Sequence, residues 1–183
     1  SIHVMNGLGP EDTTDLVALQ GGMLLVMTGL ASDEKEGQMK IRQTLSDGSA
    51  LNCFRKMCIA QGVDMEIARQ LCTDPENLLP ISSNVTHLQS PKAGYVGDLQ
   101  AMKFAEVACD IGAGGKSFGD EINHAVGLEF HHAVGDIISK GDVWISVHHE
   151  GVLDTLHVDK LLSAIRIDSN IPSKSNRLVC VIE

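Results

Sequence analysis

The sequence has 183 residues, of which 43% are hydrophobic and 21% charged, and its mean hydropathy is +0.05. These values are typical of a folded globular chain of one or two domains. The formal net charge is −10, and the aromatic side chains are one Trp, one Tyr and four Phe. Because a basic surface and stacking aromatics are both lacking, we expect no nucleic-acid partner. The purest apolar run, Met23 to Met27, is far shorter than the roughly 20 residues that cross a bilayer, so we expect no membrane partner.

The five cysteines are an odd number and form no Cys-x-x-Cys pair. This usage is typical of reduced thiols and argues against a disulfide framework or a zinc site. We therefore expect a cytosolic protein.

The first eighty residues contain sequence signals for the starts and ends of several helices. Gly9-Pro10-Glu11-Asp12 is typical of a helix start, because Pro fits the first turn and acids suit the positive end of the dipole. Apolar residues follow at helical spacing as far as Leu30. Asp33 with Glu36 resembles a reciprocal cap for a second helix, which should end at Asp47-Gly48. Further helices are expected near residues 50–61 and after residue 64, followed by a loop over residues 73–80.

After Ser90 short segments rich in β-formers alternate with glycines. They predict strands over residues 93–97, 126–130, 143–147 and 178–182. Helical patterns interrupt them near residues 100–111 and 158–165. The composition therefore predicts a mixed fold in two parts, with a boundary between Leu79 and Ser90.

The segment Asp110-Ile-Gly-Ala-Gly-Gly-Lys116-Ser117 nearly spells a phosphate-binding P-loop. Such a loop needs glycine where Asp110 stands, because a carboxylate repels the phosphate that the loop's N–H groups hold. The residues before it predict a helix, whereas a P-loop follows a strand. A glycine-rich connection is the favoured interpretation.

Ala101-Met102-Lys103-Phe104 resembles the tetrapeptide around the modified lysine of biotin-carrying domains. A carrier lysine sits at an exposed β-turn tip, but the apolar residues around Lys103 predict a helix. A biotinyl- or lipoyl-like carrier or interaction module therefore stays open only as the alternative function.

Two histidine pairs, His131-His132 and His148-His149, resemble metal ligands. Adjacent side chains on a strand point to opposite faces, so each pair offers one imidazole to each side. No further acid or histidine completes a ligand set at fixed spacing. The sequence predicts no metal site and contains no complete catalytic constellation.

The order of several short segments carries more information than any one of them. In the first half they are Asn6-Gly-Leu-Gly-Pro-Glu-Asp12, Asp15-Leu-Val17, Gly21-Gly22, Asp47-Gly-Ser-Ala-Leu51, Phe54-Arg-Lys-Met57 and Ala60-Gln-Gly-Val-Asp64. In the second half they are Ala93-Gly94-Tyr95-Val96, Ile111-Gly-Ala-Gly114, Ala125-Val-Gly127, Val134-Gly-Asp136 and Lys140-Gly-Asp142. In this order they resemble the thymidine and pyrimidine-nucleoside phosphorylase family over the whole chain, and the vertebrate-type members most.

The resemblance implies an α/β (α+β) fold with a helical segment followed by a barrel-sandwich-like β module. Residues 1–80 would be the helical segment of the family's central domain, truncated at its start, and residues 88–183 its C-terminal domain. It also implies a pentosyltransferase of pyrimidine salvage, acting on thymidine or deoxyuridine with inorganic phosphate as co-substrate and no cofactor. The resemblance further implies a homodimer.

The family's Lys-His-Ser-Thr-Gly-Gly phosphate segment has no counterpart in these 183 residues. No catalytic or substrate-binding residue carries over, and we expect the isolated chain to be inactive. The resemblance implies one element near the site, a closing loop with Gly112, Gly114, Lys116 and Ser117. Gly115 stands where the family usually has Arg, and a neighbouring Lys does not reproduce the Arg fork.

Overall fold

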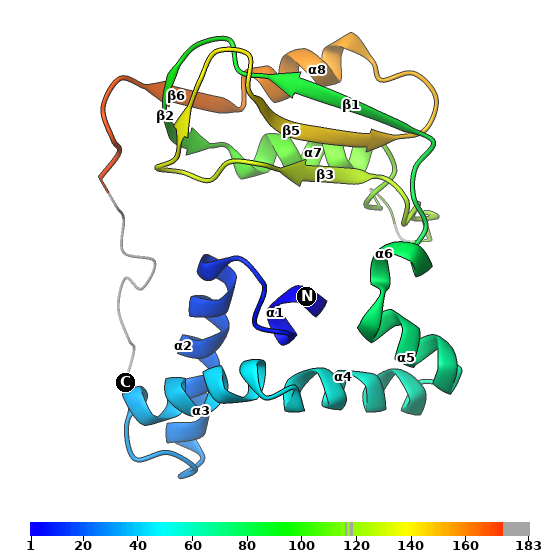
Figure 1. Ribbon diagram of the computed structural model, residues 1–183. Helices are drawn as coiled ribbons and strands as arrows, with labels where there is room; N and C mark the ends of the chain where they lie inside the picture. Colours follow the sequence, from blue (N-terminus) through cyan, green and yellow to red (C-terminus); the bar gives the residue numbers. More distant parts are fainter. Residues whose placement is uncertain (116, 118, 174–183) are drawn as a thin grey trace. The chain divides into compact units, whose positions relative to one another are not determined.

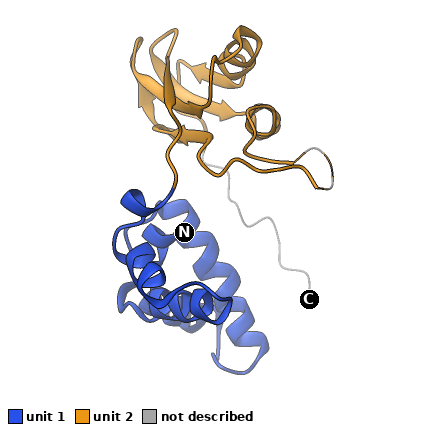
Figure 2. Cartoon of the chain, turned by 90° about the vertical axis from the view of Figure 1, so that its right-hand side faces the viewer, with its two compact units in different colours: residues 1–79 blue, residues 80–183 orange. Residues whose placement is uncertain are grey.

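The computed structural model describes residues 1–115, 117 and 119–173 (Figure 1). The chain forms two compact units, Ser1–Leu79 and Pro80–Glu183, coloured separately in Figure 2. The first unit is entirely helical, and the described part of the second combines small antiparallel sheets with helices. The expected mixed α/β (α+β) class is confirmed. Within the described residues, no helix has the length and apolar character needed to cross a membrane.

The helices of the first unit follow the predicted order. They are α1 (Ile2–Met5), α2 (Glu11–Met27), α3 (Glu34–Ser46), α4 (Ser49–Ala60), α5 (Met65–Thr73) and α6 (Pro75–Leu78). The four longer helices were expected. The segment 73–80 was predicted as a loop, and that was wrong in part, because Pro75 begins the short helix α6 at its first position.

The start of α3 shows how local chemistry sets a helix boundary. The Asp33 carboxylate accepts a hydrogen bond of 2.8 Å from the Glu36 N–H, as predicted. The Glu36 carboxylate, however, accepts from the Ser32 N–H at 2.8 Å, so the reciprocal cap is displaced by one residue. Before α4, Gly48 adopts the predicted left-handed conformation, with φ of +79°.

Helices α2 and α3 pack through a contact between glycine backbones. A methyl group on Gly22 would lie 2.7 Å from the Gln38 nitrogen, and one on Gly37 would clash with the Gly22 carbonyl. The approach is closer than any larger side chain allows. This contact holds the two longest helices of the first unit together.

The second unit contains two three-stranded sheets, which we name sheet A and sheet B. Sheet A has the strand order β1 (Asn84–Gln89), β5 (Val143–His149), β3 (Gly127–Phe130). Sheet B has the order β4 (Ile137–Ile138), β2 (Gly94–Leu99), β6 (Ile165–Asp168). Every described pairing is antiparallel. Helix α7 (Ala101–Asp110) follows β2, and α8 (Thr155–Leu162) follows β5.

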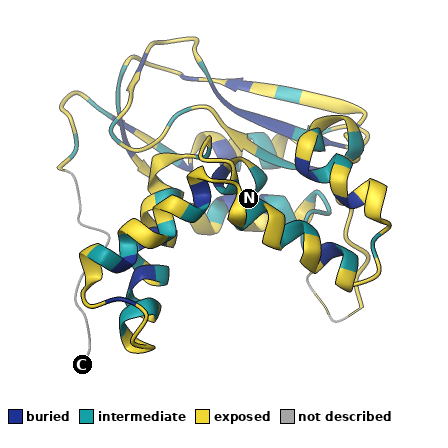
Figure 3. Ribbon diagram, turned by 60° about the horizontal axis from the view of Figure 1, so that its bottom comes forward, coloured by how far each residue is buried: buried dark blue, intermediate teal, exposed yellow. Residues whose placement is uncertain are grey.

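The core of the second unit lies around Trp144, which is fully buried. Phe104 of α7 packs edge-on against Phe130, with ring centroids 4.9 Å apart, and lies 6.1 Å from the Trp144 ring. The other buried members of this cluster are Leu88, Val96, Val107, Ile138, Ile145, Val147, Leu161, Ala164 and Ile167. Figure 3 shows this burial in dark blue.

Strand β1 was not predicted, because its residues were assigned to the connection between the two halves. It pairs with β5 from Asn84 opposite His149 to Gln89 opposite Val143. The strand expected over residues 178–182 lies outside the described residues.

Candidate functional site

The glycine-rich segment after α7 is held by hydrogen bonds of its own backbone, one of which is made to the Asp120 side chain. Gly112 has a φ of +101°, and its carbonyl accepts a hydrogen bond of 2.9 Å from the Asn123 N–H. A methyl group on Gly114 would lie 2.8 Å from Cys109 Sγ, so a larger residue here would require the Cys109 side chain to shift. The Ser117 N–H donates to the Asp120 carboxylate at 2.7 Å. Of the proposed loop residues, Lys116 lies outside the described residues.

The segment is not built as a nucleotide-binding P-loop. It follows helix α7, whereas a P-loop follows a strand. The Ser117 N–H donates to a carboxylate, although a phosphate site needs such groups free. Asp110, the residue that breaks the motif, lies 3.4 Å from His157 of α8. The predicted helix before the segment is therefore confirmed.

A hollow of about 330 Å³ adjoins the base of the segment, between α7 and α8. It is lined by Met102, Ala105, Glu106, Cys109, Asp110 and Lys160. Lys160 pairs with Glu106 across it at 2.6 Å. These groups neutralise each other, and the hollow offers no set of donors that converge on a ligand.

A polar cluster lies across sheet A, where Ser146 of β5 is 1% exposed. The ring nitrogens His87 Nδ1 and His131 Nε2 lie 2.8 and 2.6 Å from the Ser146 hydroxyl oxygen. A hydroxyl carries one proton, so it donates to one ring and accepts from the other. The cluster thereby connects β1, β5 and the residue after β3.

The two histidines of β5 point to opposite faces of sheet A, as the alternation predicted. His148 Nε2 lies 3.3 Å from the Glu129 carboxylate of β3. His149 is 5% exposed, and its Nε2 lies 2.8 Å from the Thr86 hydroxyl. Each imidazole is thus used in a contact between strands. The residues described by the structure include no group of three or more side chains that could hold a metal ion.

Lys103 lies on helix α7, as predicted, and not at a β-turn tip. Its ammonium group donates to the Ser163 carbonyl at 3.1 Å and to the Ser163 hydroxyl at 2.9 Å. It therefore caps the C-terminal end of α8, where a cation is favourable. This placement disfavours the carrier alternative.

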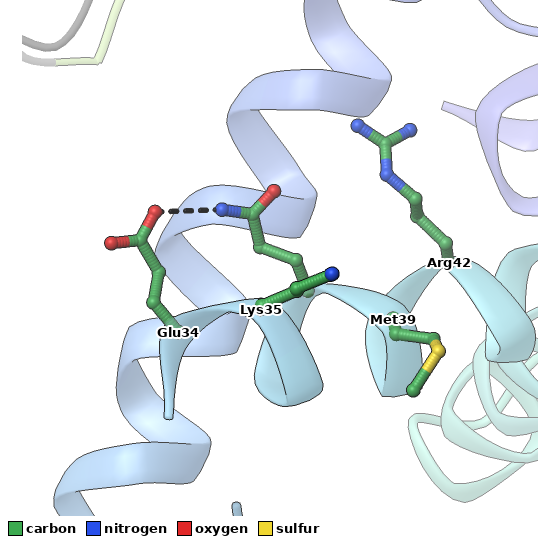
Figure 4. Close-up of a pocket in the computed structure, with 5 residues that line it drawn as sticks. Glu34, Lys35, Met39 and Arg42 are labelled. Carbon is green, nitrogen blue, oxygen red and sulfur yellow. Dashed lines mark hydrogen bonds between the residues drawn. The ribbon is translucent and has the colours of Figure 1, made fainter. Parts of the chain in front are cut away.

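A second hollow, of about 520 Å³, lies over α3 in the first unit (Figure 4). It is lined by Glu34, Lys35, Gln38, Met39 and Arg42. The Gln38 amide donates to Glu34 at 2.8 Å, and Arg42 pairs with Asp15 of α2. All five lining residues come from one helix, so the hollow is a depression on the surface of α3.

Similarity to known proteins identifies the family of the chain, which the side chains described above do not. Residues 95–168 match the family model described as pyrimidine nucleoside phosphorylase C-terminal domain. The chain is 36% identical to the thymidine phosphorylase of Rattus norvegicus, over 93% of this chain and 37% of that protein. The chain belongs to the thymidine and pyrimidine-nucleoside phosphorylase family.

Other members of the family show the same partial coverage. The thymidine phosphorylase of Homo sapiens is 37% identical, over 80% of this chain and 31% of that protein. The pyrimidine-nucleoside phosphorylase of Staphylococcus haemolyticus is 29% identical, over 92% of this chain and 38% of that protein. The chain thus spans between 31% and 38% of the length of these phosphorylases.

The matched domain contains the glycine-rich segment, helices α7 and α8, and Ser146. Strand β1, with His87, lies outside the match and yet completes sheet A. Sequence reasoning missed the roles of His87 and Ser146. The alternation of residues in β5 placed His148 and His149, but nothing local indicated that His87 pairs with a serine 59 residues away.

Proposed function

We propose that this chain is part of a thymidine phosphorylase that catalyses reversible phosphorolysis of thymidine or deoxyuridine in pyrimidine salvage. The observation that carries the proposal is the identity of 36% and 37% to two mammalian proteins of that name. Relatives named pyrimidine-nucleoside phosphorylase are 27–30% identical. This difference favours thymidine phosphorylase within the family.

In the proposed reaction a phosphate oxygen forms a bond to C1′ of the deoxyribose as the bond from C1′ to the base nitrogen N1 breaks. The electron pair leaves on N1, and a proton completes the free base. The products are thymine or uracil and 2-deoxy-α-D-ribose 1-phosphate. Inorganic phosphate is a co-substrate, and the reaction needs no cofactor.

The isolated chain of 183 residues should not perform this reaction. Rate enhancement requires donors placed on the charge that develops in the transition state. The family's Lys-His-Ser-Thr-Gly-Gly phosphate segment is absent from this sequence.

The test compares the isolated chain with the longest polypeptide encoded by the reading frame that contains it. Thymine formed from thymidine is measured by chromatography, with and without phosphate. We expect phosphate-dependent thymine from the longer polypeptide and none from the 183 residues. Thymine release that needs no phosphate, or none from either protein, would contradict the proposal.

We further propose that the segment from residue 112 to residue 120 closes towards the substrate cleft of the complete enzyme. Its site-proximal residues are Gly112, Gly114, Lys116 and Ser117. The support is the glycine content, which gives high backbone freedom, and the anchoring of the segment at Asn123 and Asp120. In the longer polypeptide, Lys116→Ala should lower turnover several-fold with an unchanged melting temperature. Lys92→Ala is the matched control. Unchanged turnover and phosphate dependence would leave the segment as a connector.

We also propose that the complete enzyme is a homodimer and lies in the cytosol. The support is the family membership and the cysteine usage, since the four described cysteines are all free thiols. Light scattering on the longer polypeptide should give twice the mass of its chain, and a monomeric mass would contradict this part.

A further inference from the structure

Helices α7 and α8 of the second unit are joined by a row of three polar contacts, which we name the polar row. Its members are Lys103 with Ser163, Glu106 with Lys160, and Asp110 with His157. Successive contacts lie about one helical turn apart on each helix. The residue numbers rise along α7 as they fall along α8, so the two helices run antiparallel. The polar row therefore ends at Asp110, where α7 ends and the glycine-rich segment begins.

The contact between Asp110 and His157 compensates two unfavourable placements. Asp110 is the last residue of α7, where the helix dipole disfavours an anion. His157 lies in the first turn of α8, where the dipole disfavours a cation. The His157 Nε2 lies 3.4 Å from the Asp110 carboxylate, and the two side chains are 24% and 29% exposed. A charge on either residue is therefore stabilised by the charge on the other.

His157 is the member of the polar row that changes its charge near neutral pH. Histidine becomes charged as the pH falls from about 8 to about 5, whereas lysine keeps its charge throughout this range. The charged residues at this end of the interface are Asp110 and Glu106 of α7, with Asp154 and Lys160 of α8. The Asp154 carboxylate caps α8 and Lys160 binds Glu106, so it is Asp110 that faces the His157 ring.

The chain turns out of α7 directly after Asp110. The N–H groups of residues 111–113 donate to the carbonyls of Val107, Cys109 and Ala108, at 3.0, 3.1 and 2.8 Å. These three hydrogen bonds close the end of the helix and set the direction in which the glycine-rich segment leaves it. A contact that holds Asp110 in place therefore also holds this turn.

We propose that His157 is a positioning residue, which in its charged form holds Asp110 and thereby fixes the turn at residues 111–113. When the pH rises and His157 loses its charge, the turn opens more often. A glycine-rich segment that starts from a fixed turn loses less conformational entropy when it closes. The expected effect on turnover rests on the closing movement proposed above, whereas the effect on the turn does not.

The first measurement needs no substitution and no turnover. Hydrogen exchange of the amides of residues 111–113 is measured at about pH 5 and about pH 8. The sample is the longest polypeptide that the reading frame of this chain encodes. Each rate is divided into the intrinsic rate at the same pH, so that the direct effect of pH on exchange cancels. We expect this protection factor to be about twofold to fivefold larger at the lower pH, as for a single ion pair.

Three variants assign the pH dependence to His157. His157→Gln carries no charge and should give the low protection factor at both pH values. His157→Lys is charged throughout and should give the high value at both. Lys160→Gln is the matched control, because it breaks the neighbouring contact of the polar row and should keep the pH dependence of the wild type. A purely structural effect of substitution would not produce opposite shifts in the first two variants.

The second measurement concerns turnover of thymidine by the same polypeptide. The kcat of the wild type is divided by the kcat of His157→Lys, so that pH effects common to both proteins cancel. We expect this ratio to fall about twofold to fivefold between about pH 5 and about pH 8.

Four results would overturn the proposal. Equal protection factors at the two pH values in the wild type mean that His157 does not hold the turn. A pH dependence that persists in His157→Gln and His157→Lys belongs to another group, and one that is lost in Lys160→Gln belongs to the whole helix interface. A constant ratio of kcat values removes the positioning role in turnover. If no thymine forms at all, the proposed reaction is contradicted, and hydrogen exchange alone decides whether His157 holds the turn.

Discussion

The two units of the chain bury very different side chains. All the largest fully buried ones lie in the second unit, among them Trp144, Ile138, Ile145 and Leu161. The buried hydrophobic residues of the first unit are Val4, Ala18, Ala31, Leu45, Cys58, Ala68 and Cys72. Caps and glycines thus suffice to define helices, but they do not supply the apolar burial that makes a unit independently stable.

The largest effect expected from this comparison concerns Trp144. Trp144→Ala should lower the free energy of unfolding by about 3–5 kcal/mol, because it leaves a large cavity in the core of the second unit. Leu24→Ala in the first unit should change it by less than about 0.5 kcal/mol in the isolated chain, since Leu24 is exposed. Chemical denaturation followed by circular dichroism measures both.

A matched variant at Trp144 separates the effect of the cavity from the effect of losing a hydrogen-bond donor. The buried Trp144 indole N–H has no hydrogen-bond partner among the described residues, so Trp144→Phe removes a donor that makes no bond there. We expect Trp144→Phe to be clearly less destabilising than Trp144→Ala. An equal loss of unfolding free energy in the two variants would contradict burial of the ring as the source of stability.

The next effect concerns the contact between α2 and α3. Gly37→Ala should destabilise the first unit by about 1–3 kcal/mol, because the added methyl meets the Gly22 carbonyl and forces the helices apart. Gly127→Ala in β3 is the control, since open space surrounds that position. Loss of helical circular dichroism on heating reports the difference, and equal melting curves would contradict the close backbone contact.

A smaller effect is expected at Lys103. Lys103→Met should cost about 0.5–1 kcal/mol, because it removes the cation that caps α8 through Ser163. Lys92→Met, in a surface turn, should be neutral. Lys103 should also gain no biotin when the chain is coexpressed with a biotin ligase, and a mass increase at this residue would revive the carrier alternative.

The smallest effect is a pH dependence at Glu36. Hydrogen bonds from Lys40 and Ser32 lower the pKa of the Glu36 carboxyl from 4.5 to about 2. Because the folded-state pKa is depressed, the stabilisation is present above pH 4.5 and is lost as the pH falls towards 2. The difference in melting temperature between wild type and Glu36→Gln should therefore shrink over that interval. A constant difference would contradict the assignment.

The elements that could be predicted from sequence are those fixed by neighbouring residues. Asp33 and Gly48 lie at the expected ends of their helices, and the helical position of Lys103 followed from the apolar residues around it. Strand β1 could not be predicted, because it is defined by pairing with β5 about sixty residues later and its own residues are mostly polar. The Ser146 cluster was missed for the same reason, since its three side chains come together only when sheet A has formed.

The chain has a single Trp and a single Tyr, and Trp144 and Tyr95 both lie in the second unit. Intrinsic fluorescence and absorbance at the usual protein wavelength therefore follow the second unit alone. If only the helical first unit unfolds, the Trp144 fluorescence should keep its native emission, because the indole stays buried in the core of the second unit. Unfolding monitored by light from Trp144 and by backbone circular dichroism should consequently report two separate transitions.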